Sequence, residues 1–337
     1  MTPLAPSKVH KRDLSEVGWS FQRARNRKDL FSALGFLLPN FLGFLLFTTF
    51  PVFVSLLASF TNWDIRPGVP LRWVGLLNFR DMFSDPDFYQ YLWNTVYLMF
   101  GIPFSIAGSL ILALILNRKL RGIVAYRTMF YIPTITSGVA LFVMWKAIYN
   151  PDFGFLNLSL DWLISHGGIN WFRENLLHTA PITFEQLPKW HLDPDWAKPA
   201  LILMGIWAGV GGGNMLLYLA GLSNIPPELY EAADLDGAAP WAKFWNVTWP
   251  QLAPTTFFVV IMSVIGGLQG GFEVARVMTN GGPAGATTTL GYYIYNKAFL
   301  EFRLGYACTV SWTMFLAILV ITLIQWRTGS RYVESAT

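Results

Sequence analysis

Residues Leu30 to Trp63 form a stretch of 34 residues that contains no Asp, Glu, Lys or Arg. Thirty residues of α-helix are about 45 Å long, whereas the hydrocarbon core of a bilayer is about 30 Å thick. The whole chain has 53% hydrophobic and 13% charged residues, against about 25% charged in an average soluble domain. So few polar side chains cannot cover a globular surface. The sequence therefore predicts an all-α integral membrane protein.

Further apolar segments bring the predicted number of membrane-spanning helices to six. The spans are expected at residues 30–63, 92–116, 128–148, 199–222, 254–277 and 304–326. Proline can kink or end a helix, so a hairpin at Pro39 and Pro51 is an alternative for the first span, and Pro133 lies inside the third. The polar segment 149–198 is expected to carry short surface helices. A tight turn from Asn280 to Pro283 is expected to precede an interfacial helix.

The basic residues indicate the orientation of these spans. Fourteen Lys and Arg lie on the side of the two termini and ten on the other side. Several of those ten are in the long 149–198 loop, and long loops weigh less in the positive-inside rule. Both termini are therefore expected in the cytoplasm. The predicted parts are a tail at 1–29, a membrane domain at 30–328 with a cytoplasmic loop at 223–253, and a tail at 329–337. Basic clusters at membrane edges account for the net charge of +4 without a nucleic-acid partner.

The loop between the fourth and fifth spans is polar and helix-forming. Pro226 and Pro227 suit a first helical turn, and the Ala232-Ala233 pair favours helix while adding little side-chain bulk. Gly237 allows a sharp turn, after which a second short helix is expected from Trp241 to Thr248. Two short helices beyond the membrane face would suit a docking surface for another protein. An amphipathic pair lying on the lipid is an equally compatible reading, because the loop is rich in aromatic residues.

Several short motifs resemble one family. The run Glu231-Ala232-Ala233, then Asp236-Gly237-Ala238, then Phe244, Val247 and Pro250, resembles the EAA loop of ABC-importer permease subunits. The flanking Tyr230, Trp241, Trp245 and Pro254 narrow the resemblance to carbohydrate-uptake permeases of the maltose and glycerol-3-phosphate type. Trp93-Asn94-Thr95 and Asn280-Gly281-Gly282-Pro283 are similar to the same family. Val247 stands where isoleucine is usual.

The resemblance implies a six-span type I permease fold that imports a sugar or related solute across a bacterial inner membrane. It implies four kinds of neighbour: a second, different permease, two cytoplasmic ATPase subunits that bind ATP and Mg, an extracytoplasmic solute-binding protein, and lipid. In this family the loop sits in a groove on the ATPase and couples ATP hydrolysis to alternating access. The coupling residues implied here are Glu231, Ala232, Ala233, Asp236, Gly237 and Pro250.

Polar residues inside the fourth and fifth spans are candidates for a translocation pathway. Both spans are rich in glycine, which weakens a helix or lets backbones pack closely, and transporters line pathways with interrupted helices. We nominate Asn214, Gln269 and Glu273. Gln269 and Glu273 are four residues apart, so they are expected to share a helix face. Close packing is the alternative for the glycines, and an ion pair with Arg276 is the alternative for Glu273.

Other chemistry is not indicated. The sequence has no G-x-x-x-x-G-K-[ST] phosphate loop, no histidine spacing typical of a metal site and no nucleophile paired with a base. The chain is therefore predicted not to be an enzyme and to hold no catalytic residue, metal or cofactor of its own. The alternative function is an ATP-independent secondary carrier, which would need intramembrane charges for ion coupling. The sequence offers little of that kind beyond Glu273.

Overall fold

The computed structural model describes residues 27–118 and 121–336, which are almost entirely helical. Two isolated β-bridges join Thr61 to Trp73 and Asp64 to Arg303. The chain divides into two compact units, Met1–Leu57 and Ala58–Thr337. Of the predicted N-terminal tail, residues 1–26 lie outside the described residues.

The first unit contains one continuous helix. It is made of α1 (Arg27–Phe44), the π-helical turn η3 (Leu45–Thr49) and most of α2 (Phe50–Ala58). Pro39 lies inside α1 without ending it. The alternative of a hairpin is therefore wrong. The helix ends before the predicted Trp63, because the chain turns at Ala58, whose carbonyl accepts a hydrogen bond from the Thr61 N–H at 3.0 Å.

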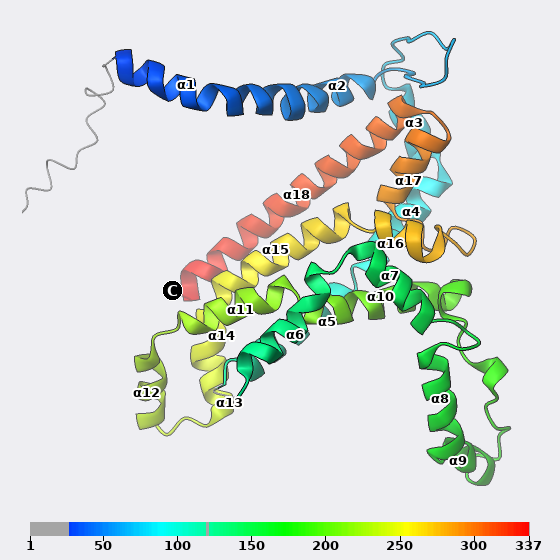
Figure 1. Cartoon of the computed structure of the whole chain (residues 1–337), viewed down its shortest axis with the longest axis vertical. Helices are drawn as coiled ribbons and strands as arrows, with labels where there is room; N and C mark the ends of the chain where they lie inside the picture. The colour runs from blue at the N-terminus through cyan, green and yellow to red at the C-terminus, as the bar shows by residue number, and fades with distance from the viewer. Residues whose placement is uncertain (1–26, 119–120, 337) are drawn as a thin grey trace, which may run out of the picture. The chain divides into compact units, whose positions relative to one another are not determined.

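The second unit holds the remaining elements (Figure 1). In chain order these are α3 (Leu77–Ser84), α4 (Pro86–Leu98), α5 (Gly101–Leu116), α6 (Ile123–Ile135), α7 (Gly138–Ile148), α8 (Phe155–His166), α9 (Ile169–Asn175), η4 (Phe184–Gln186), η5 (Trp190–Leu192), α10 (Pro194–Val210), α11 (Gly213–Ser223), α12 (Pro227–Leu235), α13 (Pro240–Lys243), η6 (Phe244–Thr248), α14 (Trp249–Gln251), α15 (Ala253–Gln269), α16 (Phe272–Val274), η7 (Ala275–Thr279), α17 (Leu290–Tyr295), η8 (Asn296–Leu300) and α18 (Leu304–Ala336). The short helices expected in segment 149–198 and after the Asn280 turn are present.

The described residues contain six segments that could cross a membrane. Four are helices that are long and apolar enough: Ala33–Ala58, Pro86–Leu116, Pro194–Ser223 and Leu304–Gly329. The other two are bent pairs, α6 with α7 at 97° and α13–α14 with α15 at 64°. The prediction of six spans is confirmed when each bent pair counts as one span. The crossing part of the second pair is then α15, which ends at Gln269 and not at the predicted residue 277, while α13–α14 belong to the predicted loop.

The third span is not the single helix from 128 to 148 that the sequence predicts. Pro133 lacks a backbone N–H in the last turn of α6, and Thr136 and Ser137 then adopt extended backbone before α7 begins. Proline in a helix interior removes a hydrogen bond and favours a break nearby. At the other end of the chain, α18 continues to Ala336, beyond the predicted end of the sixth span at Trp326.

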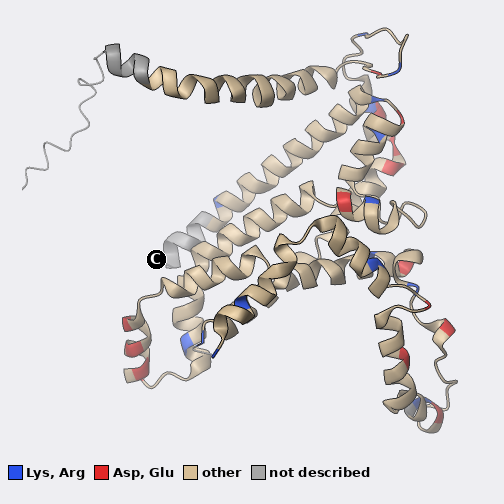
Figure 2. Cartoon of the chain, in the orientation of Figure 1, with Lys and Arg blue, Asp and Glu red and all other residues tan. Residues whose placement is uncertain are grey.

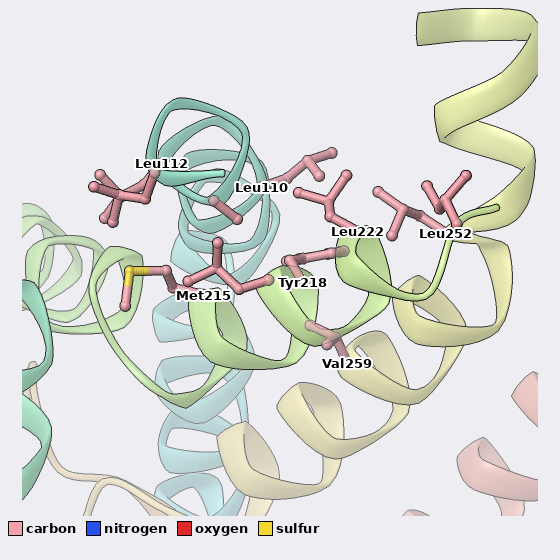
Figure 3. Close-up of a cluster of buried hydrophobic side chains, with 11 residues drawn as sticks. Leu110, Leu112, Met215, Tyr218, Leu222, Leu252 and Val259 are labelled. Carbon is pink, nitrogen blue, oxygen red and sulfur yellow. The ribbon is translucent and has the colours of Figure 1, made fainter. Parts of the chain in front are cut away.

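Three buried clusters hold the second unit together. The first joins α5, α11 and α15 through side chains such as Leu110, Tyr218 and Val259 (Figure 3). The second surrounds α7 and α10, where the Tyr149 hydroxyl donates to the Ala200 carbonyl at 2.7 Å. The third joins α3, α4, α17 and α18. In lipid, such close packing and hydrogen bonding hold helices together, because water exclusion supplies little force between them.

Charged residues of the second unit fall mostly near helix ends and in loops, with α12 as an exception (Figure 2). The outward faces of the spans instead carry large apolar side chains, as with Phe104 in α5 and Leu323 in α18. A soluble domain rarely exposes apolar surface on this scale. The faces of these spans are therefore suited to lipid or to other membrane subunits.

Candidate functional site

The loop between α11 and α15, residues 224–252, begins with the helix predicted to dock. Ile225 is buried in the first cluster and fixes the start of the loop. Pro226 and Pro227 open α12, and Glu228 follows in its first turn, where the helix dipole favours a carboxylate. The loop thus starts from a packed core position and leads directly into a helix with a favourable N-terminus.

Helix α12 ends in a Schellman motif centred on Gly237. The Ala238 N–H donates to the Ala233 carbonyl at 2.9 Å, and the Gly237 N–H donates to the Asp234 carbonyl at 3.1 Å. This pattern requires a left-handed residue after the helix, and Gly237 has φ +68°. The sharp turn predicted for Gly237 is therefore present, and it directs the chain into α13.

The second half of the loop is one helical run formed by α13, η6 and α14. It is packed on the protein along one side: Phe244, Val247 and Trp249 contact the first cluster, as does Tyr230 of α12. The Tyr230 hydroxyl and the Thr248 hydroxyl form a hydrogen bond at 2.9 Å, which ties α12 to this run. Lys243 forms an ion pair with Asp234 between the same two helices. The loop is consequently a small folded unit with a fixed geometry.

The opposite side of the loop is exposed. Glu231, Ala232 and Asp236 are exposed and Ala233 is half-buried. Leu235 is 90% exposed and Trp241 is 71% exposed. Figure 2 shows acidic residues along α12, which contains no Lys or Arg. This outer surface is therefore acidic, with two projecting apolar side chains, and is complementary to a groove that is partly apolar and partly basic.

The predicted coupling residues fall into two places. Glu231, Ala232, Ala233, Asp236 and Gly237 lie together on α12 and its C-terminal turn. Pro250 lies apart from them in α14, next to the start of α15, and is half-buried. The sequence did not predict a role for Leu235, because one leucine in an apolar chain carries no signal until its exposure is known.

The three pathway candidates lie next to breaks in helices. Asn214 is the second residue of α11, which follows the Gly211-Gly212 break. Gln269 is the last residue of α15. Gly270 is then extended and Gly271 has φ +88°, so Glu273 belongs to the separate helix α16. The prediction that Gln269 and Glu273 share a helix face is therefore wrong, because two glycines end the helix between them.

Glu273 does not pair with Arg276 in the described residues. The Arg276 guanidinium lies instead over the ring of Tyr295, 4.7 Å from its centroid. The Glu273 carboxylate approaches the N-terminus of α7, since a Cβ on Gly138 would come 2.9 Å from its Oε2 atom. In residues 27–118 and 121–336, no described hydrogen bond or ion pair joins any two of the three candidates.

Several of the glycines allow close approach of backbones. A Cβ on Gly211 would meet the Phe130 carbonyl oxygen at 2.2 Å, and one on Gly209 would meet the Ser105 hydroxyl at 2.0 Å. The glycine-rich breaks are thus partly a consequence of tight packing of α10 on α5 and α6. Close packing was the alternative that the sequence left open for these glycines.

Two motifs far apart in the sequence contact each other. The Asn94 amide donates to the carbonyls of Gly285 and Thr288 at 2.9 and 3.0 Å. The Thr95 hydroxyl accepts from the Leu290 N–H at 2.9 Å. Helix α4 therefore fixes the segment between the Asn280 turn and α17.

Comparisons with known proteins give a consistent result. Residues 21–326 match the family described as binding-protein-dependent transport system inner membrane component. The chain is 35% identical to the probable ABC transporter permease protein YesP of Bacillus subtilis, over 91% of this chain and 93% of that protein. It is 36% identical to the lactose transport system permease protein LacF of Rhizobium radiobacter, over 83% and 87% of the two chains. A solved bacterial ABC transporter that imports the acidic polysaccharide alginate has a chain of the same fold, with a TM-score of 0.73 and 25% identity over 92% of this chain and 99% of that one.

Proposed function

The chain belongs to the family of binding-protein-dependent transport system inner membrane components, and we propose that it is the permease subunit of an ABC importer for a sugar or related solute. The permease fold and a multi-pass membrane location follow from the family. The sugar class rests on relatives such as the lactose permease. The alginate importer of the same fold widens the range of candidate solutes to oligosaccharides.

The feature that carries this proposal is the exposed, internally braced loop between α11 and α15. A coupling element must transmit force, so it must be rigid on its own protein and open to its partner. The Tyr230–Thr248 hydrogen bond and the packing of Phe244 and Trp249 supply the first property. The exposure of Glu231 and Leu235 supplies the second.

In this proposal α12 docks on a cytoplasmic ATPase subunit. Glu231, Ala232, Ala233, Asp236 and Gly237 form the contact, and Pro250 sits where the loop joins α15. Closure of the ATPase dimer on ATP pulls the loop inward, and α15 moves with it because η6 and α14 lead directly into that helix. ATP and Mg are bound by the ATPase subunits and not by this chain.

The remaining parts of the importer are proposed because the chain belongs to this family. They are a second, different permease, two ATPase subunits and an extracytoplasmic binding protein that delivers the solute. The membrane is a bacterial inner membrane with both termini in the cytoplasm. Residues 1–29 and 329–337 are cytoplasmic tails of the 30–328 membrane domain, and 223–253 is its cytoplasmic loop. Asn214, Gln269 and Glu273 line the pathway from the helix breaks.

The energy source of uptake tests this proposal. Right-side-out membrane vesicles that contain the chain and its partners would be given labelled lactose, a labelled oligosaccharide or labelled glycerol 3-phosphate, together with binding protein. We expect uptake of one of these when the vesicles are loaded with ATP, and we expect an uncoupler to leave it unchanged. Uptake without ATP that collapses with the proton gradient would instead identify a secondary carrier.

A further inference from the structure

Helix α8 has an apolar outer face that remains largely exposed among the residues that the structure describes. Phe155, Leu158 and Trp162 are spaced by three and four residues, so they share one face of the helix. Their side chains are 70%, 51% and 63% exposed. Asp161, the one Asp, Glu, Lys or Arg of α8, lies at the edge of this face, about 60° around the helix from Leu158. A helix that faced water on this side would carry polar residues there.

The inner face of α8 is already used for packing. Ile164 is buried, and Leu156 and Leu160 pack against the second cluster. Asn157 is 2% exposed. Its amide donates to the carbonyls of Pro151 and Pro188, each at 3.1 Å. The outer face therefore cannot turn inward to hide its apolar side chains.

These contacts fix α8 at a defined depth. Asn157 also accepts a hydrogen bond at 2.7 Å from the indole nitrogen of Trp190, and Trp190 lies in η5 directly before α10. Helix α10 begins the span Pro194–Ser223. The other end of that span leads into the α11–α15 loop. The base of α8 is consequently held at the membrane face opposite that loop.

The direction of α8 suits a helix that lies along this face. In Figure 1, α8 runs across the direction of α10 and does not continue it. Apolar side chains are also exposed near the start of α10, at Leu192 of η5 and Trp196 of α10. Helices α8 and α9 contact each other as a helical hairpin, and Trp171 of α9 is 67% exposed on it. Tryptophan is enriched at the boundary between lipid chains and headgroups.

We propose that α8 is an interfacial helix whose Phe155, Leu158 and Trp162 insert into the lipid leaflet at the membrane face opposite the α11–α15 loop. An apolar face with aromatic anchors and no charge binds the boundary between headgroups and acyl chains, to a depth of about 5–10 Å. The lipid covers the exposed face. The hydrogen bonds of Asn157 to Pro151, just after α7, and from Trp190, just before α10, transmit this anchoring to those two helices.

Spin-label accessibility tests this proposal. The full chain with Cys308→Ser would carry a single nitroxide at Leu158→Cys or at Trp162→Cys and would be reconstituted into vesicles of phosphatidylethanolamine and phosphatidylglycerol. The matched control is Glu174→Cys, an exposed polar position in α9 of the same hairpin. Two label positions on α8 guard against a variant that fails to fold.

We expect labels at 158 and 162 to be accessible to oxygen and shielded from a water-soluble nickel chelate, with an oxygen-to-nickel ratio at least about fivefold above that of position 174, since oxygen concentrates where the helix meets acyl chains. Equal nickel accessibility at all three positions would place α8 in water and overturn the proposal. Shielding from both reagents at 158 and 162 would show a protein contact, such as a second copy of the chain, and would overturn it equally.

Discussion

At the scale of single residues, Gly237 both forms the turn that ends α12 and belongs to the proposed contact with the ATPase. Its φ of +68° costs a non-glycine residue about 1 kcal/mol, and no atom lies within 4 Å of an added Cβ. A substitution there adds a side chain to the docking surface without a clash inside the chain. We expect Gly237→Asp to lower uptake at least about tenfold, equivalent to roughly 1.4 kcal/mol, with normal membrane insertion by immunoblot.

The matched control for this variant is Gly122→Asp. Gly122 has φ +72°, likewise has no neighbour within 4 Å and lies outside the α11–α15 loop. The two substitutions therefore impose similar backbone strain. Normal uptake in Gly237→Asp, or an equal loss in both variants, would remove the argument that the turn belongs to a docking surface.

The sequence predicted the Gly237 turn because the requirement is local: a helix that ends and reverses needs a residue without a Cβ. It did not predict that Leu235 projects outward, since exposure depends on where α12 sits on the folded unit. The sequence also placed Gln269 and Glu273 on one helix face, because glycines inside a span are compatible with a continuous helix, whereas here Gly270 and Gly271 end it.

At the scale of elements, the break between α10 and α11 depends on close contact with α6. An alanine at Gly211 would bring its Cβ to 2.2 Å from the Phe130 carbonyl oxygen, a contact with rigid backbone. Gly213, two residues later, has no atom within 4 Å of an added Cβ. We expect Gly211→Ala to lower the melting temperature by several degrees, which corresponds to a cost of about 1–3 kcal/mol, and Gly213→Ala to leave it nearly unchanged. Equal melting curves would mean that the break is not set by packing.

A second element-scale feature is the junction of α4, α17 and α18 at Asp85. Its Oδ2 atom accepts hydrogen bonds from the hydroxyls of Tyr293 at 2.6 Å and Tyr306 at 3.1 Å. Partial burial alone would raise the pKa of Asp85, but these hydrogen bonds and that from the Asp87 N–H hold this pKa below its usual value. Burial raises the pKa of the Tyr293 hydroxyl, and the hydrogen bond to Asp85 raises it further. The hydroxyl therefore remains a donor.

The lowered pKa of Asp85 gives a pH dependence of defined sign. A carboxyl with a pKa lower in the folded than in the unfolded state stabilises the fold above the unfolded pKa of about 4, and this stabilisation is lost as the pH falls below it. We expect Asp85→Asn to lower stability by about 1.5–3 kcal/mol at pH 7. The difference from wild type should shrink in melting curves recorded at decreasing pH below about 4. Asp87→Asn, an exposed neighbour, is the control. A difference that does not vary with pH would contradict the assignment.

At the scale of the whole molecule, the sequence was sufficient for the number and approximate positions of the spans. Long apolar segments must cross lipid wherever they pack, so composition alone predicts them. The bends were not predicted. Pro133 lies inside the third span, but the 97° change of direction occurs at Thr136 and Ser137, because the course of a broken helix depends on what it packs against. The contact between the Asn94 motif and the segment after Asn280 was likewise not predicted, because these segments are far apart in the sequence.

The α11–α15 loop is proposed as the place where a separate ATPase drives this permease. This role is tested most directly by cross-linking Ala232→Cys, an exposed position of α12, to the purified cognate ATPase carrying one cysteine in its docking groove. The permease would carry Cys308→Ser. The control is Ser165→Cys, an exposed position of α8, which is proposed to lie at the opposite membrane face. We predict a cross-link at 232 whose yield changes with ATP, and none at 165. The absence of a cross-link at 232 in a properly inserted permease would contradict the account and leave α12 as a surface helix.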